Sequence, residues 1–310
     1  HNGRTGFYEH NLYPLRYNKA VAEITREVTG NTIIWARSAW SGSQRYPLHW
    51  GGDAATTNTA MAATLRGGLS LGLSGFTFWS HDVGGFTTKS PENLYRRWTP
   101  VGMLSSHVRS HGEPPTEPWE YSAEFLEDFR NADNLRYQLM PYIYGQAKHA
   151  SENGLPMLRA LFIEYPNDPG SWLIDDQYLF GSDILVAPLF EDVTVRNVYL
   201  PPGKWIDYQT GTVYQGGWHS IKAGDIPIVM LVKEGTALPH IKLAQSTSQM
   251  DWSNIELKVY ASDAATVTCK LFLPNDPKLY QLELTRKGNA FELLNNPVSN
   301  KTKIHVQLAR

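Results

Sequence analysis

The stretch TIIWARSAWSGSQRYPLHWGGD, residues 32–53, carries the pattern that decides the fold. It begins with a short apolar run, TIIWA at 32–36, whose β-branched residues are typical of a buried strand. A loop follows, and residues 48–50 are a second short strand candidate before a turn with two glycines. Where such strands alternate with helices, function lies on the loops that follow the strands, so this stretch predicts a site as well as a sheet.

The segments on both sides of this stretch alternate between helix and strand. The first fourteen residues lack either period and predict a loop. Residues 17–30 have apolar steps of three and four and a final glycine, which predict a helix and its end. The elements expected after residue 53 are a helix with Met61, Leu65 and Leu69 on one stripe, a strand at 75–79, a helix opened by Ser90 and Pro91, and a long helix at 122–150 that Pro141 kinks or breaks.

The alternation ends near residue 150, and the chain then changes character. Only three or four strands precede that point, whereas a (β/α)8 barrel needs eight strands and about 250 residues. Residues 1–150 are therefore either a small open sheet or the second part of a barrel. Short strand-like runs between turn signals follow, and a polar stretch near residue 244 divides them. We expect an α/β plus all-β chain, with an α/β unit at 1–150 and small antiparallel β-sandwich domains at 151–243 and 244–310.

The composition excludes several classes of protein. The net charge is −2 without a long run of one sign, which argues against a nucleic-acid or anionic-membrane partner. No apolar run approaches the ~18 residues of a membrane span, and the N-terminus does not resemble a signal peptide. Cys269 is the single cysteine, which excludes an internal disulfide and a cysteine-cluster metal site. Aromatic residues make up 12% of the chain and suit flat, hydroxylated ligands such as sugars, although composition alone favours a tryptophan-rich core.

The first candidate site lies at residues 37–53. Arg37 follows a predicted strand directly, and its guanidinium suits vicinal hydroxyls or a carboxylate. Asp53 ends a tight turn after Trp50, and burial against the indole would raise the pKa of the carboxyl, as a proton donor requires. The alternative is that Asp53 caps a helix that starts near Ala54. The two roles do not exclude each other.

The second candidate lies at residues 79–86, where a predicted strand ends in Ser80, His81 and Asp82 before two glycines. One interpretation is a structural turn with a hydrogen bond between His81 and Asp82. In the other, Asp82 orients its neighbours and Phe86 forms a wall against a ligand.

The third candidate is the pair His107 and His111, with Glu113 close behind. On a helix this spacing could ligate zinc, but Pro114 and Pro115 follow at once and a third ligand with helical spacing is lacking. A neutral histidine that donates to a ligand hydroxyl fits better, with a structural histidine as the competing interpretation.

A pair of carboxylates is what glycoside hydrolysis needs, about 5–5.5 Å apart for retention of configuration. Asp53 is one candidate. Glu9, Asp82 and Glu113 are available as partners, but no local motif favours any of them.

The sequence resembles glycoside hydrolase family 31 at these same residues. The resemblance runs from residue 1 to about 240 and rests on six segments, HNLYPLRYNKAVAE, WARSAWSGSQRYPLHWGGD, FWSHDVGGF, RWTPVGMLSSHVRSHG, YLFGSDILVAPLF and VYLPPGKWIDYQTG. It implies a retaining α-glycosidase without metal or organic cofactor. It also implies the C-terminal half of a (β/α)8 barrel, followed by two small antiparallel β-sandwich domains, one proximal and one distal.

The resemblance implies a role for each matching residue. Asp53, which closes HWGGD, matches the general acid/base aspartate of the family. Arg37 and His111 match residues that bind the sugar in the −1 subsite, and Trp50 matches an aromatic that lines it. Two further matches lie beside the pocket, Asp82 and Phe86 of SHDVGGF, with Phe86 toward the leaving group.

This sequence departs from the family pattern at the nucleophile. In the family the nucleophile is an aspartate in a short motif just upstream of the HNLY segment, and this sequence starts after that motif. We therefore expect this chain to be the C-terminal portion of a longer enzyme, with the missing N-terminal part of that enzyme as its partner, because a half barrel alone exposes strand edges and apolar surface. The segment SSHVRSHGEPPTEPWEY most resembles α-xylosidases, and α-glucosidases come next. The expected substrate is an α-linked oligosaccharide with terminal xylose or glucose. A transglycosylase, a non-catalytic sugar-binding protein and a homo-oligomer all stay open.

Overall fold

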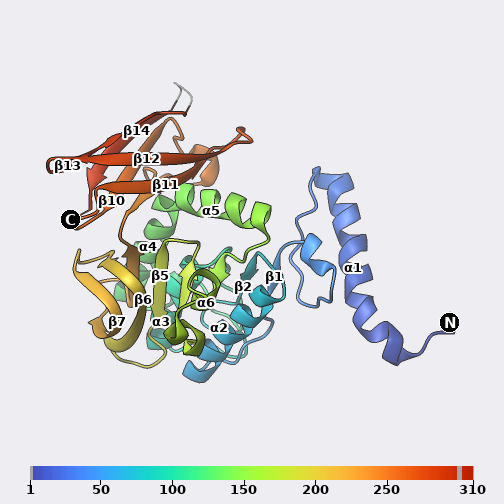
Figure 1. Ribbon diagram of the computed structural model, residues 1–310. Helices are drawn as coiled ribbons and strands as arrows, with labels where there is room; N and C mark the ends of the chain where they lie inside the picture. Colours follow the sequence, from blue (N-terminus) through green and yellow to red (C-terminus); the bar gives the residue numbers. More distant parts are fainter. Residues whose placement is uncertain (1–2, 299–301, 310) are drawn as a thin grey trace.

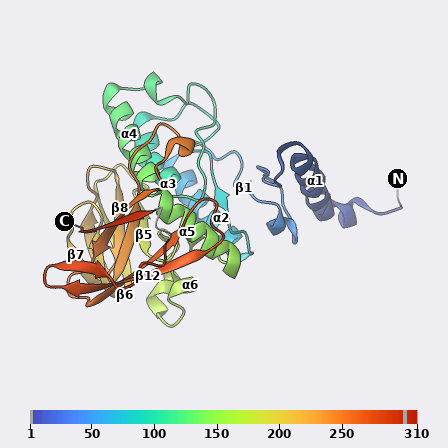
Figure 2. The ribbon, with the colours of Figure 1, turned by 90° about the horizontal axis from the view of Figure 1, so that it is seen from above.

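The computed structural model describes residues 3–298 and 302–309. Short parallel strands and their helices come first, and two six-stranded sheets follow. Helix α1 (Gly6–Thr29) stands apart from this body and is joined to it by the chain that leads into β1 (His49–Trp50). Both views, Figure 1 and Figure 2, show this separation.

Helix α1 begins at Gly6, eleven residues before the predicted start at Tyr17, so the loop expected over the first fourteen residues is wrong from Gly6 onward. The Thr5 side chain caps the helix by accepting a hydrogen bond from the Tyr8 amide. Pro14 lies inside the helix, and Tyr13 stacks on Tyr17 one turn later. The predicted end is confirmed, since Gly30 adopts φ 82° at the C-cap.

Four strand segments lie parallel in chain order. The chain at 34–36 bonds to residues 47–50, with the Ala36 amide donating to Leu48 at 2.9 Å. β1 pairs in parallel with β2 (Trp79–Ser80), and Asp82 forms a parallel bridge with Arg109. The strand predicted at 75–79 is thus shifted toward its carboxyl end.

The predicted burial of residues 32–36 is wrong apart from Ile34. Ile33 is 57% exposed and Trp35 37% exposed. Within the described residues, the chain at 33–37 bonds to a strand on one side only, so its alternate side chains lose the cover that a second neighbouring strand would give.

The helices predicted after residue 53 are present, and the first packs its predicted stripe into the core. α2 (Asn58–Leu73) buries Met61, Leu65 and Leu69 as expected. α3 (Glu92–Met103) begins after Pro91, but Ser90 does not cap it, because the residue at the N-cap is Pro91 itself. The predicted break at Pro141 is confirmed, since α4 (Ala123–Gln138) and α5 (Met140–Asn153) are separate helices that share Leu139 as a cap residue.

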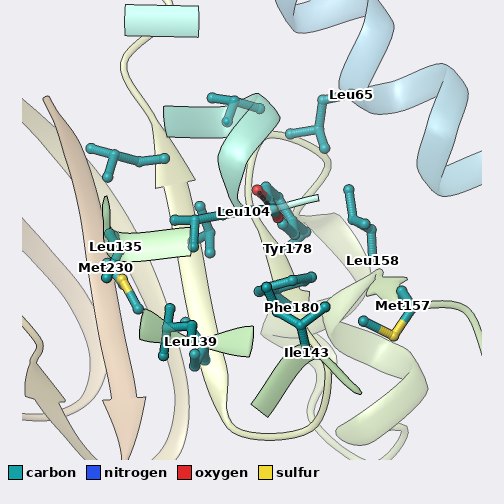
Figure 3. Close-up of a cluster of buried hydrophobic side chains, with 14 of the residues drawn as sticks. Leu65, Leu104, Leu135, Leu139, Ile143, Met157, Leu158, Tyr178, Phe180 and Met230 are labelled. Carbon is teal, nitrogen blue, oxygen red and sulfur yellow. Dashed lines mark hydrogen bonds between the residues drawn. The ribbon is translucent and has the colours of Figure 1, made fainter. Parts of the chain in front are cut away.

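One core joins these helices to the first sheet. Figure 3 shows Leu65, Leu104, Leu135 and Ile143 from the helical part beside Tyr178 and Phe180 of the sheet. The Tyr178 hydroxyl donates to the carbonyl of Leu104 at 2.9 Å, so even the polar tip of this buried ring has a partner.

The two six-stranded sheets differ in their pairing. The first is antiparallel throughout and the second is mixed, because β10 pairs with β14 and β9 with β11 in parallel. The expectation of purely antiparallel pairing is therefore wrong for the second sheet. The order of strands in the first sheet is β3 (Leu158–Arg159), β4 (Tyr178–Phe180), β5 (Ile184–Pro188), β8 (Ile228–Lys233), β6 (Val195–Asp207) and β7 (Val213–Lys222). The order in the second sheet is β13 (Ala290–Leu293), β12 (Leu279–Lys287), β11 (Thr266–Phe272), β9 (Thr236–His240), β10 (Asn254–Tyr260) and β14 (Lys303–Leu308).

The short helix α6 (Leu161–Glu164) follows β3. The chain passes from the first sheet to the second between β8 and β9. The division into domains at 150 and 243 stays a prediction. Among the described helices, none is both long and apolar enough to cross a bilayer.

Adjacent glycines on α2 provide a matched test of this packing. A Cβ added at Gly68 would overlap the Trp79 ring, whereas one at Gly67 would meet no atom within 4 Å. We expect Gly68→Ala to lower the free energy of unfolding by about 2 kcal/mol through overpacking. Gly67→Ala should raise it by about 0.5–1 kcal/mol, because alanine loses less backbone entropy in a helix. Urea unfolding of both variants checks this, and equal midpoints would contradict the packing of Trp79 on α2.

Candidate active site

Arg37 and Asp53 meet at the carboxyl ends of two neighbouring parallel strands. Arg37 Nη1 donates to Asp53 Oδ2 at 3.2 Å. Between β1 and Asp53 the chain turns at Gly52, where φ is 86°. A side chain there would overlap the Arg37 guanidinium, so glycine is required for its close approach as well as for the turn.

Two expectations about Asp53 are wrong. Its side chain is 43% exposed, so the predicted burial against Trp50 does not occur in this chain. The helix-cap alternative also fails, because α2 begins five residues after Asp53 and its N-cap is Thr57, whose hydroxyl accepts from the Ala60 amide at 3.1 Å. The Asp53 carboxylate is therefore held by Arg37 and open on its other side.

A second group links Asp82 to Trp50 through Arg109. Asp82 is fully buried, and its Oδ1 accepts from Arg109 Nε at 2.6 Å. The Arg109 guanidinium lies over the Trp50 ring, 4.6 Å from the centroid, and 5.3 Å from that of Trp35. The hydrogen bond proposed between Asp82 and His81 does not form, because Asp82 turns to Arg109 instead.

Arg109 is the residue that the sequence analysis missed. The sequence indicates Arg109 only by its position in HVRSH, two residues before His111. Its contact with Asp82 depends on the parallel bridge between the two residues, which the structure shows. Within the described residues, Asp82 Oδ2 and Trp50 Nε1 are buried without a partner. Buried polar atoms normally have one, so these two are available to a ligand or to another part of the protein.

Phe86 and His111 form the third part of the site. Their ring centroids lie 5.3 Å apart. The Phe86 amide donates to the carbonyl of Ala54 at 2.8 Å, which ties this pair to the residue next to Asp53. The backbones of the two segments that carry Phe86 and His111 lie close together, because a Cβ added at Gly112 would lie 2.8 Å from the Gly85 carbonyl oxygen. Trp50 thus ends β1, and Arg37, Asp53, Asp82, Phe86 and His111 lie on the chain segments that follow or adjoin the parallel strands.

His107 and His111 do not share a helix face. They lie on the irregular chain after α3, where His107 packs edge-on against Trp35 and His111 contacts Phe86. The helical spacing on which the zinc alternative depended is therefore absent here. In the described part of the chain, no three His, Cys, Asp or Glu side chains are grouped so as to hold a metal ion.

Two buried histidines, His49 and His81, and the half-buried His107 make stability depend on pH. Burial lowers the pKa of His49 and of His81 to about 4 and that of His107 to about 3, from an ordinary 6.5. Because the folded state disfavours the protonated rings, the unfolded chain binds more protons below pH 6.5.

We therefore expect stability to be full above pH 6.5 and to fall as the pH drops from there toward 4. Urea midpoints at pH 7.0 and 5.5 test this, since carboxyl groups titrate mostly below about pH 5. The decrease should be smaller in the His81→Leu variant. Midpoints that are equal at both values would contradict the burial of these rings.

A large cavity opens beside Arg37 on the side away from β2. Its volume is about 1220 Å³, and it lies between α1 and the chain at 34–39, with Trp50 at its end. Tyr13, Tyr17 and Val21 of α1 line it and are exposed. The open edge of the 33–37 chain therefore faces an apolar wall across empty space.

Comparison with known proteins places this chain in a family. The family model described as the glycosyl hydrolases family 31 TIM-barrel domain matches residues 1–146, and that of the family 31 C-terminal domain matches residues 154–238. The chain belongs to glycoside hydrolase family 31.

Relatives of this family 31 chain are enzymes of several kinds. An α-xylosidase of Emericella nidulans is 39% identical over 251 residues, which cover 77% of this chain and 32% of the relative. An α-glucosidase 2 of Bacillus thermoamyloliquefaciens is 30% identical over 304 residues, 96% of this chain and 38% of the relative. The structure of the cycloalternan-forming enzyme of Listeria monocytogenes with a pentasaccharide substrate is similar, with a TM-score of 0.85 and 28% identity over 92% of this chain and 29% of the other. The family 31 chain thus spans about a third of the length of these curated relatives.

Proposed function

We propose that residues 1–150 of this family 31 chain are the second part of a (β/α)8 barrel in a retaining α-glycosidase that releases terminal, non-reducing xylose or glucose from α-linked oligosaccharides. Asp53 is the general acid/base, and the nucleophile is an aspartate on a segment that precedes residue 1. The observation that carries the proposal is the Arg37–Asp53 pair at 3.2 Å, set at the carboxyl ends of parallel strands beside Trp50 and Arg109.

The open side of the sheet supports a barrel completed by a preceding segment. In the described part of the chain, the main-chain groups of Trp35 and Arg37 have no hydrogen-bond partner and can bond another parallel strand. Helix α1 presents exposed Tyr13, Tyr17 and Ile24. A cavity of about 1220 Å³ lies between them. Further strands placed there would pair the edge and cover the apolar side chains, which water otherwise surrounds.

Two of the three carboxylates considered as partners of Asp53, Glu9 and Asp82, also favour a nucleophile from elsewhere. Glu9 lies on α1 and forms ion pairs with Arg4 and Arg16. Asp82 is engaged by Arg109. Neither is placed as a free carboxylate opposite Asp53, so in this proposal they are not the second carboxyl that retention needs.

The reaction follows from these placements. The aspartate of the preceding segment attacks the anomeric carbon while the protonated Asp53 gives its proton to the departing glycosidic oxygen. Asp53, now a carboxylate, takes a proton from the water that cleaves the glycosyl ester, and the enzyme returns to its first state. In this scheme the 43% exposure of the Asp53 side chain gives a leaving group and a water access to it.

The remaining residues hold the sugar. Arg37 and His111 donate to ring hydroxyls, and Trp50 forms an aromatic wall under the ring. Asp82 fixes the Arg109 guanidinium, and Phe86 lies toward the leaving group. No step uses a metal or an organic cofactor.

The product anomer tests the proposal in the complete protein. Hydrolysis of an unactivated α-xylosyl disaccharide and of its α-glucosyl counterpart is followed by NMR. The α-anomer should appear first, and the faster substrate assigns the sugar. First release of the β-anomer, or cleavage of neither disaccharide, would overturn the proposal.

Transfer to a sugar acceptor is a second candidate, favoured by the likeness to a cycloalternan-forming enzyme. The same residues would serve, but a saccharide hydroxyl would replace water in the second step. Product analysis at high substrate concentration separates the two, since a transferase accumulates longer oligosaccharides. Sugar binding without cleavage would identify a non-catalytic homologue.

A further inference from the structure

Arg136 of α4 is an unusual buried charge. The residue is 8% exposed, and among the described residues no carboxylate lies within ion-pair distance of it. Burial lowers its pKa to about 10, against the opposing charge of Asp133. A buried charge without an ion pair is costly, so its hydrogen-bond partners must account for its presence.

Those partners are three main-chain carbonyls in one short turn. Arg136 Nη1 donates to Met103 at 2.6 Å and to Ser105 at 2.7 Å, and Nη2 donates to Ser106 at 3.2 Å. Met103 is the last residue of α3. The final carbonyls of a helix lack partners within it, and a cation at that end also compensates the helix dipole.

The turn leads directly into the chain that carries Arg109 and His111. Its other side is held by β2, because Ser106 Oγ donates to the Trp79 carbonyl at 2.8 Å and Ser80 Oγ donates to that of His107. The loop therefore leaves α3 from a turn that is fixed from α4 on one side and from β2 on the other.

We propose that Arg136 is a positioning residue that fixes the turn at 103–106 and thereby holds Arg109 and His111 in register with Asp53. The positioning of the loop stands on the contacts above, and its effect on sugar binding rests on the proposed function. Arg136 itself acts at a distance from the sugar, through the backbone.

The guanidinium geometry is what the turn requires. Its planar fork directs several N–H groups at fixed angles, so one side chain reaches three carbonyls. A lysine keeps the charge but presents one compact ammonium, which cannot reproduce that arrangement. Arg130 is the matched control, because it is an exposed arginine of the same helix whose one ion pair among the described residues is with Glu127 at 3.2 Å.

Hydrogen exchange tests the positioning without reference to activity. In the complete protein, amides of residues 104–112 should exchange about tenfold faster in Arg136→Lys than in wild type, with exchange in β4 and β5 unchanged. Arg130→Lys should match the wild type. Arg136→Met is the second variant, and it removes the donors without burying a charge, so it keeps the test available where the lysine variant does not fold.

Kinetics on the α-glycoside test the consequence. A misplaced sugar-binding loop should raise KM and lower kcat/KM by about 10–100-fold, since small displacements at a reacting centre are costly. A merely structural role would lower the folded fraction, and so apparent kcat, with KM unchanged. In a His111→Ala background the effect of Arg136→Lys on kcat/KM should shrink, because both changes disturb one contact.

Wild-type exchange at 104–112 in folded Arg136→Lys and Arg136→Met would overturn the inference. Faster exchange with unchanged KM would overturn its catalytic part. If the wild-type protein cleaves no α-glycoside, the proposed function fails, and exchange alone still decides whether Arg136 positions the loop.

Discussion

Asp53→Ala in the complete protein is expected to lower kcat/KM for an unactivated α-linked disaccharide by about 10³-fold, within the range that general acid–base groups contribute. The leaving sugar is a poor leaving group, and without a proton from Asp53 it departs as an alkoxide. The loss should therefore be largest for disaccharides and much smaller for aryl glycosides, whose phenolate leaves without protonation.

The second half of the reaction gives an independent test of the same residue. An aryl glycoside forms the glycosyl ester in Asp53→Ala, but water then lacks its base. Azide needs no deprotonation, so it should restore turnover of the aryl substrate and yield a glycosyl azide of retained configuration. It should restore nothing for the disaccharide, where departure is blocked.

The matched control is Asp175→Ala, which removes an exposed carboxylate paired with Arg66 at 2.8 Å. It should keep wild-type kinetics with both substrates. Wild-type hydrolysis of the disaccharide by Asp53→Ala would refute Asp53 as the acid/base and leave the fold and family untouched.

The sequence predicts elements well where local pattern and burial agree. The stripe of α2 and the break at Pro141 follow from spacing and from the missing proline amide, and both depend on few distant contacts. Residues 32–36 show the opposite case. Their β-branched pattern predicts burial, but burial depends on a neighbouring strand that the local sequence does not specify.

The same distinction between local pattern and distant contacts holds for the residues of the site. Arg37 and Asp53 follow predicted strands, so the rule for parallel sheets finds them, and the structure pairs them. The partner of Asp82 was not accessible from spacing, because Arg109 lies 27 positions further along the chain and meets it through strand pairing. The exposure of Asp53 was missed for a related reason, since burial is a property of the whole assembly around the loop.

Asp82→Ala should cause the largest loss of stability at the site. The mutation removes the only described ion-pair partner of Arg109 and leaves a cavity in place of a fully buried side chain. Breaking a buried pair from one side costs about 3–5 kcal/mol. Arg109 is 29% exposed and regains some hydration, so we expect a decrease of about 2–3 kcal/mol in the free energy of unfolding.

Two variants separate the ion pair from other effects, with urea midpoints of the complete protein as the measurement. Asp82→Asn keeps an oxygen that accepts from Arg109 Nε and nearly the same volume, so it should lose less than Asp82→Ala. Asp175→Ala breaks a pair whose members are both exposed, and it should cost less than about 1 kcal/mol. If Asp82→Ala unfolds no more easily than Asp175→Ala, Asp82 does not hold Arg109 over Trp50, and the wall of the proposed sugar site needs another support.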